Sequence, residues 1–274
     1  MNGPERLNPM EIMSPQNARV KEWAGLLDKK YRDKSGKYIV EGVHLVQEAL
    51  LAEADVEILA YDIDKGMPAE LGGLLQSVPG METVAVSAAV IAKCSSTNTP
   101  QPVFAVIRKE RDGAEAALDK PGSLVVVLDG VQDPGNVGTI IRSADAAGAD
   151  GVILGRGCAD LYNPKTIRST MGSMFHLPVV EADLAEILPQ ARQRGVMLVS
   201  TSLQGVDSCY SHDFRSGSQW LLIGSEGRGI SPETAQQVDK SIIIPMKGRA
   251  ESLNAAMAAT ILLFEAMRQR GFNK

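Results

Sequence analysis

Short apolar runs alternate with helix-like segments along most of the chain, and this alternation predicts an α/β protein. In the carboxyl half, the apolar runs 124–128, 151–154 and 220–223 each have strand length and precede a loop or helical pattern. Because strands alternate with helices, we expect a mostly parallel sheet that is covered on both faces. The amino half alternates in the same way, from a helix at 17–27 to a strand at 103–107, which predicts a second, smaller α/β domain.

Residues 109–122, KERDGAEAALDKPG, are charged, rich in small residues and closed by Pro-Gly. Such a composition is typical of a linker. We therefore predict an amino-terminal domain at 1–108, a linker at 109–122 and a carboxyl-terminal domain at 123–274. The first fifteen residues are expected to form a loose tail.

The last helical pattern is apolar on both of its faces. One face has the spacing of a helix stripe and consists of Leu253, Met257, Ile261 and Phe264. The opposite face consists of Ala255, Ala258, Ala259, Leu262 and Leu263. A helix of this kind must be covered on both sides. The sheet of its own domain covers one side, and a second copy of the chain is the simplest cover for the other.

Composition excludes several classes of protein. The net charge of −5 argues against a protein that coats nucleic acid without specificity. The odd number of cysteines, three, and their wide separation argue against a disulfide framework or a zinc site, so we expect no metal and a reducing cytoplasm. The chain shows neither a signal-peptide pattern nor an apolar stretch of about 18–20 residues, so no membrane span is expected.

Basic residues gather between positions 19 and 37, where this segment has only three acids. The seven basic residues are Arg19, Lys21, Lys29, Lys30, Arg32, Lys34 and Lys37. A solvated helix and turn would explain this cluster. Composition alone favours this interpretation, and a surface that contacts RNA phosphates is the alternative.

Polar, glycine-containing loops follow three of the predicted strands of the carboxyl half. Their sequences are DPGNVGTIIRSADAAGADGVIL at 133–154, IGSEGRGIS at 223–231 and IPMKGRAESLNAAMAA at 244–259. In a parallel sheet such loops meet at the carboxyl edge of the strands, where ligands bind. The dinucleotide fingerprint G-x-G-x-x-G and the phosphate-binding Walker A pattern are both absent, which argues against a Rossmann methyltransferase or an NTPase.

In this order and spacing, the three segments resemble the signature motifs of the SpoU/TrmH family, RNA ribose 2′-O-methyltransferases of the SPOUT superfamily. The segment at 162–179 is also similar to the family's connecting region. The amino half resembles the ribosomal-protein-like RNA-binding domain of many rRNA-directed members, chiefly at 37–50 and 95–107. The resemblance implies a trefoil knot in the carboxyl domain, a bound S-adenosylmethionine, and a homodimer formed through the knotted domain and its final helix.

The resemblance also implies a set of functional residues. The motif positions that carry catalysis correspond to Asn136, Arg142, Glu226, Ser252 and Asn254. The cofactor pocket would comprise Thr201, Ser202, Gly224, Glu226, Gly227, Ile244, Met246, Ser252, Leu253 and Asn254. The amino domain's resemblance favours RNA contact by Arg19, Lys21, Lys29, Lys30, Arg32 and Lys37, and Lys165 and Arg168 are further candidates.

Arg142 is the family's central catalytic residue. Because a guanidinium stays protonated at working pH, we expect it to clamp a phosphate and stabilise the developing 2′-oxyanion rather than to act as a base. Asn136 and Glu226 are expected to hold the loop and orient Arg142, while Ser252 and Asn254 fix the hydroxyl and the cofactor. A purely structural alternative exists for Ser252, which could cap the last helix.

The leading prediction is an S-adenosylmethionine-dependent 2′-O-methyltransferase that acts on rRNA. Three alternatives stay open: the same reaction on tRNA, a resistance-type methylase that protects the ribosome from an antibiotic, and a non-catalytic RNA-binding or assembly factor. A small-molecule methyltransferase is less compatible with the basic segment. The target nucleotide is not encoded in any short motif.

Overall fold

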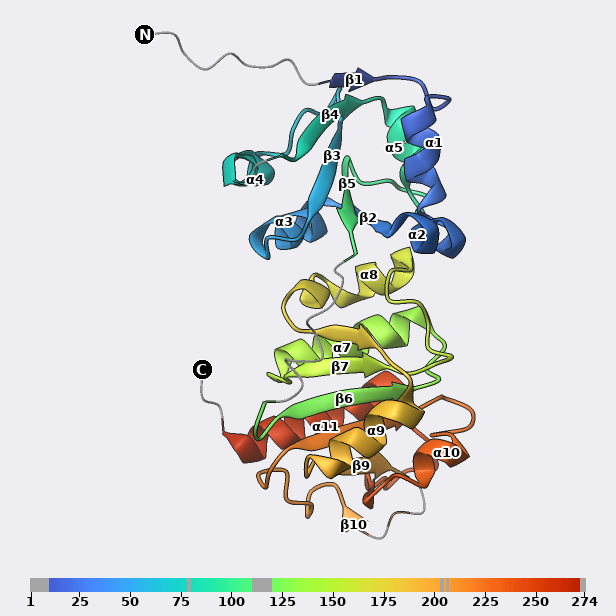
Figure 1. The fold of residues 1–274 in the computed structure, drawn as a ribbon, viewed down its shortest axis with the longest axis vertical. Helices are drawn as coiled ribbons and strands as arrows, with labels where there is room; N and C mark the ends of the chain where they lie inside the picture. Colours follow the sequence, from blue (N-terminus) through green and yellow to red (C-terminus); the bar gives the residue numbers. More distant parts are fainter. Residues whose placement is uncertain (1–9, 78–79, 110–119, 203–204, 206, 272–274) are drawn as a thin grey trace. The chain divides into compact units, whose positions relative to one another are not determined.

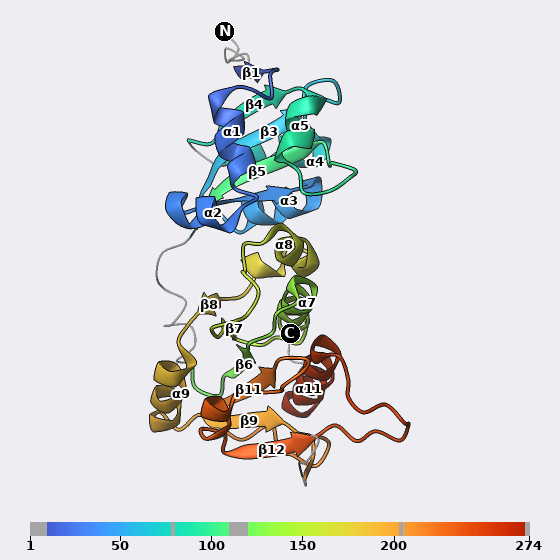
Figure 2. The same cartoon turned by 90° about the vertical axis from the view of Figure 1, so that its right-hand side faces the viewer.

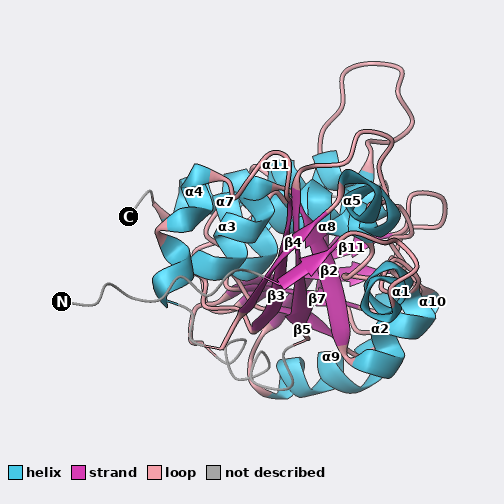
Figure 3. Cartoon of the chain, turned by 90° about the horizontal axis from the view of Figure 1, so that it is seen from above, coloured by secondary structure: helices cyan, strands magenta, loops and turns pink. Residues whose placement is uncertain are grey.

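The computed structural model describes residues 10–77, 80–109, 120–202, 205 and 207–271. The chain divides into two compact units. The first comprises Met1–Arg111 together with Tyr162–Arg168, and the second comprises Asp112–Leu161 and Ser169–Lys274. Most of the predicted linker lies outside the described residues, so the domain boundaries stay a prediction. In both units, helices lie outside the strands (Figure 3).

The sheet of the first unit has the strand order β1-β4-β3-β5-β2. Its strands are β1 (Met10–Ile12), β2 (Lys37–Glu41), β3 (Val56–Asp62), β4 (Glu82–Val86) and β5 (Val103–Arg108). β1, β4 and β3 run parallel, whereas β5 is antiparallel to both β3 and β2. The helices are α1 (Ala18–Gly25), α2 (Lys29–Ser35), α3 (Val43–Leu51), α4 (Ala69–Gly72) and α5 (Ala88–Cys94), with a 3₁₀ turn at Leu74–Ser77. Figure 1 shows α1 and α5 on one side of this sheet and α3 and α4 on the other.

One expectation for this unit was wrong. The predicted loose tail contains β1, whose Ile12 is buried and pairs in register with Val86, so edge pairing orders this segment. Helix α2 begins after the Asp28 cap and ends at Gly36, whose left-handed φ of 66° turns the chain into β2. Ser87 caps the start of α5, where its hydroxyl accepts a hydrogen bond from the Val90 amide at 3.3 Å.

The second unit confirms the predicted mostly parallel sheet. Its strand order is β10-β12-β9-β11-β6-β7-β8, and the described pairings are all parallel. The strands are β6 (Leu124–Asp129), β7 (Gly151–Leu154), β8 (Val179–Glu181), β9 (Met197–Thr201), β10 (Asp207–Ser208), β11 (Gln219–Gly224) and β12 (Lys240–Ile243). The central strands β6 and β11 are buried on both faces, which explains their continuous apolar runs.

Helices cover both faces of this sheet. They are α7 (Pro134–Ala146), α9 (Leu184–Gln193), α10 (Pro232–Ala235) and α11 (Ala255–Arg270), with a 3₁₀ turn at Ser173–Phe175. Figure 2 shows α9 on one side of the sheet and α7 and α11 on the other. α7 and α11 pack together, and the Ser143 and Thr260 hydroxyls are 2.7 Å apart across their contact. The trefoil knot implied by the resemblance stays a prediction.

Helix α8 (Pro164–Thr170) interrupts the second unit in sequence, and most of it groups with the first unit. Tyr162, just before α8, makes two contacts within the first unit. The Tyr162 ring lies 4.6 Å from the Tyr38 ring, centroid to centroid, and Lys109 Nζ lies 4.6 Å from the centre of the Tyr162 ring. The contact between Tyr38 and Tyr162 therefore joins side chains more than a hundred positions apart in the sequence.

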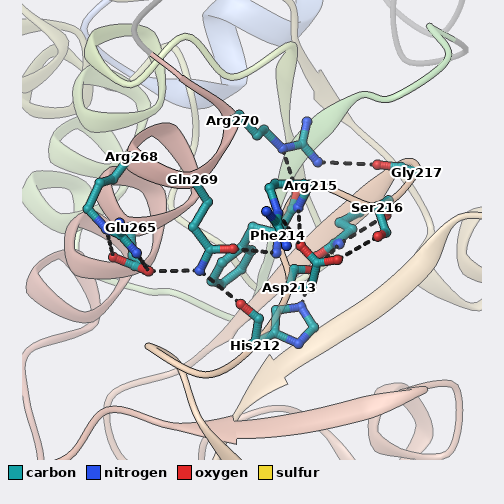
Figure 4. Close-up of polar contacts among 11 residues, drawn as sticks. His212, Asp213, Phe214, Arg215, Ser216, Gly217, Glu265, Arg268, Gln269 and Arg270 are labelled. Atoms are coloured by element: carbon teal, nitrogen blue, oxygen red, sulfur yellow. Dashed lines mark hydrogen bonds and ion pairs between the residues drawn. The ribbon is translucent and has the colours of Figure 1, made fainter.

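The carboxyl end of α11 is fixed by a polar cluster (Figure 4). The Arg270 guanidinium donates to three backbone carbonyls: Phe214 at 2.8 Å, Gly122 at 2.5 Å and Gly217 at 3.3 Å. Gln269 donates to the His212 carbonyl at 2.9 Å and accepts from the Phe214 amide at 2.9 Å. These contacts join the last helix to the segments that precede β6 and β11.

We predict that Arg270→Ala destabilises the second unit. The change leaves three carbonyls without their donor, at a cost of about 1–3 kcal/mol. The midpoint of thermal unfolding should then fall by about 2–4 °C for each kcal/mol lost. Arg215→Ala is the matched control, because Arg215 is exposed and pairs only with Asp213 among the described residues. Equal midpoints for the two variants would contradict this account.

Candidate active site

Four neighbouring strands of the second unit end at the same edge of the sheet. β12, β9, β11 and β6 are adjacent and parallel, so the loops that follow Ile243, Thr201, Gly224 and Asp129 meet there. Figure 2 shows the loop between β12 and α11 extending away from the sheet. This is the edge at which parallel α/β sheets place ligands.

A cavity of about 770 Å³ lies among these loops. Residues that follow β9, β11 and β12 line it, together with the first turns of α11. Of the ten residues that the sequence placed in a cofactor pocket, nine are in the lining: Thr201, Ser202, Gly224, Glu226, Gly227, Ile244, Met246, Ser252 and Leu253. Asn254 is the exception. The lining also includes residues that sequence reasoning did not assign to the pocket, among them Ser200, Arg228 and Glu251.

The loop after β11 folds back on itself beside this cavity. Ser225 and Gly229 exchange two backbone hydrogen bonds, both of 2.9 Å, and Gly229 has a left-handed φ of 68°. This closure brings the backbone of Gly229 and Ile230 against Gly224, where a Cβ would overlap it. Glycine is therefore required at position 224 by close backbone approach.

Asn136 links the three motif segments through its side-chain amide. Its Nδ2 donates to Glu226 Oε1 at 2.5 Å, and its Oδ1 accepts from Asn254 Nδ2 at 3.0 Å. Asn254 Oδ1 accepts from the amides of Ala256 and Met257, which fixes which end of this side chain can donate. The hydrogen-bond directions are thus consistent from the start of α11 to the Glu226 carboxylate.

Asn254, and not Ser252, is the N-cap of α11. The alternative reading of Ser252 as the helix cap is therefore wrong. Ser252 lies two residues earlier, is exposed, and lines the cavity. Its hydroxyl is free of a capping role, as the catalytic prediction requires.

Arg142 lies apart from this hydrogen-bonded group. It is exposed in the third turn of α7, and Asn136 is in the first turn of the same helix. The expectation that Asn136 and Glu226 orient Arg142 finds no direct contact: within the described residues, no hydrogen bond or ion pair joins Arg142 to either side chain. The structure brings Asn136, Glu226 and Asn254 together and leaves Arg142 and Ser252 outside that network.

The sequence matches two family models that together span most of the chain. Residues 123–264 match the SpoU rRNA methylase family, and residues 17–105 match the MRM3-like substrate binding domain. The chain belongs to the SpoU rRNA methylase family. Two of the segments that resemble the SpoU motifs, 223–231 and 244–259, line the cavity, and all three contribute a side chain to the Asn136 network.

Similar proteins cover nearly the whole chain. The 23S rRNA (guanosine(2553)-2′-O)-methyltransferase RlmP of Bacillus subtilis (strain 168) is 37% identical over 93% of this chain and 98% of its own length. The 23S rRNA (uridine(2479)-2′-O)-methyltransferase of Streptomyces viridochromogenes is 35% identical over 97% of this chain and 95% of its own. The crystal structure of the SpoU methyltransferase AviRb from Streptomyces viridochromogenes in complex with AdoMet superposes with a TM-score of 0.86, at 35% identity, covering 93% of this chain and 98% of that chain.

Asp129 is a positioning residue in this SpoU domain that sequence reasoning missed. Its carboxylate accepts a hydrogen bond from the Ser231 amide at 2.7 Å, and Ser231 in turn caps α10. Asp129 therefore ties the end of β6 to the end of the Ser225–Gly229 loop. An acidic residue at the end of a buried strand was the available signal, but only the pairing of β6 with β11 shows what it holds.

The basic residues predicted to contact RNA differ in their exposure and in whether they already pair with other side chains. Lys21, Lys30 and Lys165 are exposed, and Lys29 is exposed but pairs with Asp33 at 3.8 Å. Arg19 donates to Glu82 at 2.9 Å, Lys37 pairs with Glu57 at 2.7 Å, and Arg168 donates to Ser96 at 2.6 Å. The hydrogen bond from Arg19 lowers the pKa of Glu82 below its usual value.

Arg32 is the one predicted RNA contact that the structure argues against. Its side chain is buried, only 2% exposed, and Nη1 donates to the Leu26 carbonyl at 2.8 Å. The guanidinium thus fixes α2 to the end of α1 and is not available at the surface. We leave Arg32 out of the proposed RNA surface.

The cysteines are buried or partly buried, as packing residues are. Burial raises the pKa of the Cys94 thiol to about 12 and that of Cys158 to about 11, which keeps both in the unreactive thiol form. In the part of the chain that the structure describes, no group of three or more His, Cys, Asp or Glu could hold a metal ion. The described helices also include none long and apolar enough to cross a membrane.

We predict that Gly224→Ala disrupts the Ser225–Gly229 loop, because the added methyl group would displace the backbone of Gly229. Hydrogen exchange measured by mass spectrometry should show faster exchange of the Ser225 and Gly229 amides. Gly227→Ala is the matched control in the same loop, since its Cβ would meet nothing within 4 Å. Unchanged exchange in Gly224→Ala would contradict the close approach.

Proposed function

We propose that this protein transfers a methyl group from S-adenosylmethionine to a ribose 2′-hydroxyl of rRNA. The observation that carries the proposal is the Asn136 network, which joins all three SpoU motif segments beside the cavity. The family match, the two 23S rRNA 2′-O-methyltransferases and the AdoMet complex of a similar structure support the same reaction.

The cavity fits the cofactor. Its volume of about 770 Å³ lies within the range of roughly 300–1,000 Å³ that small-molecule sites occupy. The lining combines backbone groups of the Gly224–Gly229 segment with the apolar side chains of Ile244, Met246 and Leu253. The close approach of Gly229 to Gly224 leaves no space for side-chain bulk at that point. The trefoil knot implied by the family would join these loops into one pocket, and we include it in the proposal.

The chemistry is an in-line displacement. S-adenosylmethionine supplies an electrophilic methyl group. The protein must align the ribose with it, exclude water and stabilise the 2′-oxygen as its proton leaves. Arg142 suits the last task because its cation is exposed and has no anionic partner among the described residues. A phosphate next to the target ribose would give this guanidinium a bidentate partner and place it beside the reacting oxygen.

The Asn136 network has a positioning role in this proposal. Asn136 and Asn254 hold the Glu226 carboxylate in place, and Asn254 also caps α11, so the loop before that helix is fixed at one end. Ser252 lies within this loop and lines the cavity, where its hydroxyl can hydrogen-bond to the ribose or the cofactor. Removal of one amide would loosen two loops together.

rRNA is the substrate that the comparisons favour over tRNA. Two relatives that match nearly the whole chain are named as 23S rRNA 2′-O-methyltransferases, and residues 17–105 of the first unit match the MRM3-like substrate binding domain. These relatives methylate a guanosine and a uridine respectively, so similarity of this degree does not define the nucleotide. An rRNA substrate also agrees with the expected cytoplasmic location.

A homodimer is part of the proposal. The face of α11 away from the sheet is apolar and exposed, with Met257 at 51%, Phe264 at 42% and the preceding Leu253 at 39%. The opposite face packs on α7 and β11. The sequence predicted a helix that needs cover on both sides, and in the single chain one side has none among the described residues. A second copy of this surface would bury it.

We predict that Arg142→Ala lowers kcat for methyl transfer by about 10²–10³-fold, the usual loss when an oxyanion stabiliser is removed. The assay is label transfer from S-adenosylmethionine to unmodified 23S rRNA, with tRNA in parallel. Cofactor affinity should stay unchanged, because Arg142 does not line the cavity. Arg215→Ala is the control for loss of an exposed arginine. Transfer to tRNA alone would favour the tRNA alternative, and cofactor binding without transfer to either RNA would contradict the proposed reaction.

We predict that Phe264→Asp shifts the protein from dimer to monomer, because it places a charge at the centre of the proposed interface. The dissociation constant should rise on the order of thirtyfold or more, as expected for a central interface residue. Sedimentation velocity across a concentration series measures it. Leu51→Asp is the matched control, since Leu51 is 57% exposed and lies in the first unit. A monomeric wild-type protein would remove the dimer from the proposal.

A further inference from the structure

Tyr31 is an exposed aromatic side chain in the middle of α2. It is 56% exposed, and its ring rests on Gly25 at the end of α1, where a Cβ would come within 3.3 Å of Tyr31 Cγ. The absence of a side chain at Gly25 therefore lets the Tyr31 ring pack against the backbone there. Because a tyrosine loses little conformational freedom when it is ordered, a seated, exposed ring is a good surface for contact.

The neighbouring contacts fix the orientation of α2. On one side, Arg32 is buried and donates to the Leu26 carbonyl at 2.8 Å. On another side, Asp33 accepts from Lys109 Nζ at 2.9 Å, and this hydrogen bond lowers the pKa of Asp33. The two ends of α2 are fixed by the Asp28 cap at its start and by Gly36 at its end. The exposed face that remains is defined by Lys30, Tyr31 and Lys34.

This face carries positive charge that no described residue neutralises. Lys30 and Lys34 are both exposed, and helical spacing places them together along one side of Tyr31. Among the described residues, neither ammonium group has a hydrogen bond or ion pair. The acid of this helix, Asp33, faces elsewhere and pairs with Lys109 and Lys29. One aromatic ring beside two free cations is the arrangement that binds single-stranded nucleic acid.

We propose that the Lys30–Tyr31–Lys34 face binds an unpaired segment of the RNA substrate, with one base stacked on the Tyr31 ring and the flanking phosphates held by Lys30 and Lys34. A protein partner would be expected to meet a larger apolar patch, whereas here one ring stands among charges. Folded RNA presents unstacked bases in its loops and bulges, where aromatic side chains recognise them. This inference rests on the proposed function, since it supplies an RNA contact for that enzyme.

The test compares two RNA probes with the full-length protein. Fluorescence anisotropy measures binding of a labelled 12-nucleotide oligoadenylate and of a 12-base-pair RNA duplex, without cofactor. Tyr31→Ala should weaken oligoadenylate binding about tenfold, the loss expected for one stacked base, and should leave duplex binding unchanged. Tyr31→Trp should retain the affinity because it keeps an aromatic face. Tyr210→Ala is the matched control, since Tyr210 is also 56% exposed and lies in the second unit.

The lysines have a separate readout. Lys30→Gln and Lys34→Gln should each reduce the slope of log K against log salt concentration by about 0.7 for the single strand, because each removes one phosphate contact. Lys240→Gln, which removes a lysine paired with Asp207, should leave the slope unchanged. Unaltered slopes in both test variants would overturn the assignment of phosphates to these lysines.

Three results would overturn the proposal: no binding of oligoadenylate by the wild type, equal affinities for Tyr31→Ala and Tyr210→Ala, or equal losses on both probes. A lower thermal unfolding midpoint of Tyr31→Ala would reveal a folding defect in that variant. The comparison would then use Tyr31→Trp and Tyr31→Leu, of which the second keeps an apolar side chain without the ring. The binding assay needs no turnover. Failure of methyl transfer with intact Tyr31-dependent binding would therefore contradict the proposed reaction and leave this site standing.

Discussion

One side-chain amide determines how the active edge of the second unit is assembled. Asn136, in the first turn of α7, donates to Glu226 after β11 and accepts from Asn254 before α11. An amide suits this position because it offers a donor and an acceptor at once, and neither a carboxylate nor a hydroxyl of that length provides both ends in a fixed plane. The network therefore couples three loops that the sheet brings together but does not fix.

The parallel sheet supplies the setting for this network. β6, β9, β11 and β12 are adjacent, so their following loops share one edge, and Asp129 ties two of them directly. Close backbone approach at Gly224 then shapes the cavity wall. At the far end of α11, Arg270 and Gln269 hold the helix to the segment before β11, so the helix that begins in the active-site network is also held where it ends. Rigid support at both ends suits a site that must align two reactants.

The two units divide the work of an RNA-modifying enzyme in chemically distinct ways. The second unit offers a cavity lined by glycine backbone, apolar side chains and several polar or charged side chains, and the exposed Arg142 lies outside this lining. The first unit has exposed lysines and a seated tyrosine, and its other charged side chains are largely paired with acids. The acidic net charge of the whole chain is compatible with this arrangement, because the positive face is local.

The sequence by itself determined the α/β class and the mostly parallel second sheet, because strand and helix periodicities are local properties. The family resemblance of its motif segments placed ten residues in a cofactor pocket, and nine of these ten are among the residues that line the cavity. The sequence also indicated that α11 needs cover on both sides. It could not show that β1 pairs with β4, that Arg32 is buried against Leu26, or that Asn254 and not Ser252 caps α11. These outcomes depend on which segments become neighbours. Only the tertiary structure placed Asn136 between Glu226 and Asn254, because hydrogen bonds between residues some ninety to 118 positions apart follow from strand order and not from any local pattern.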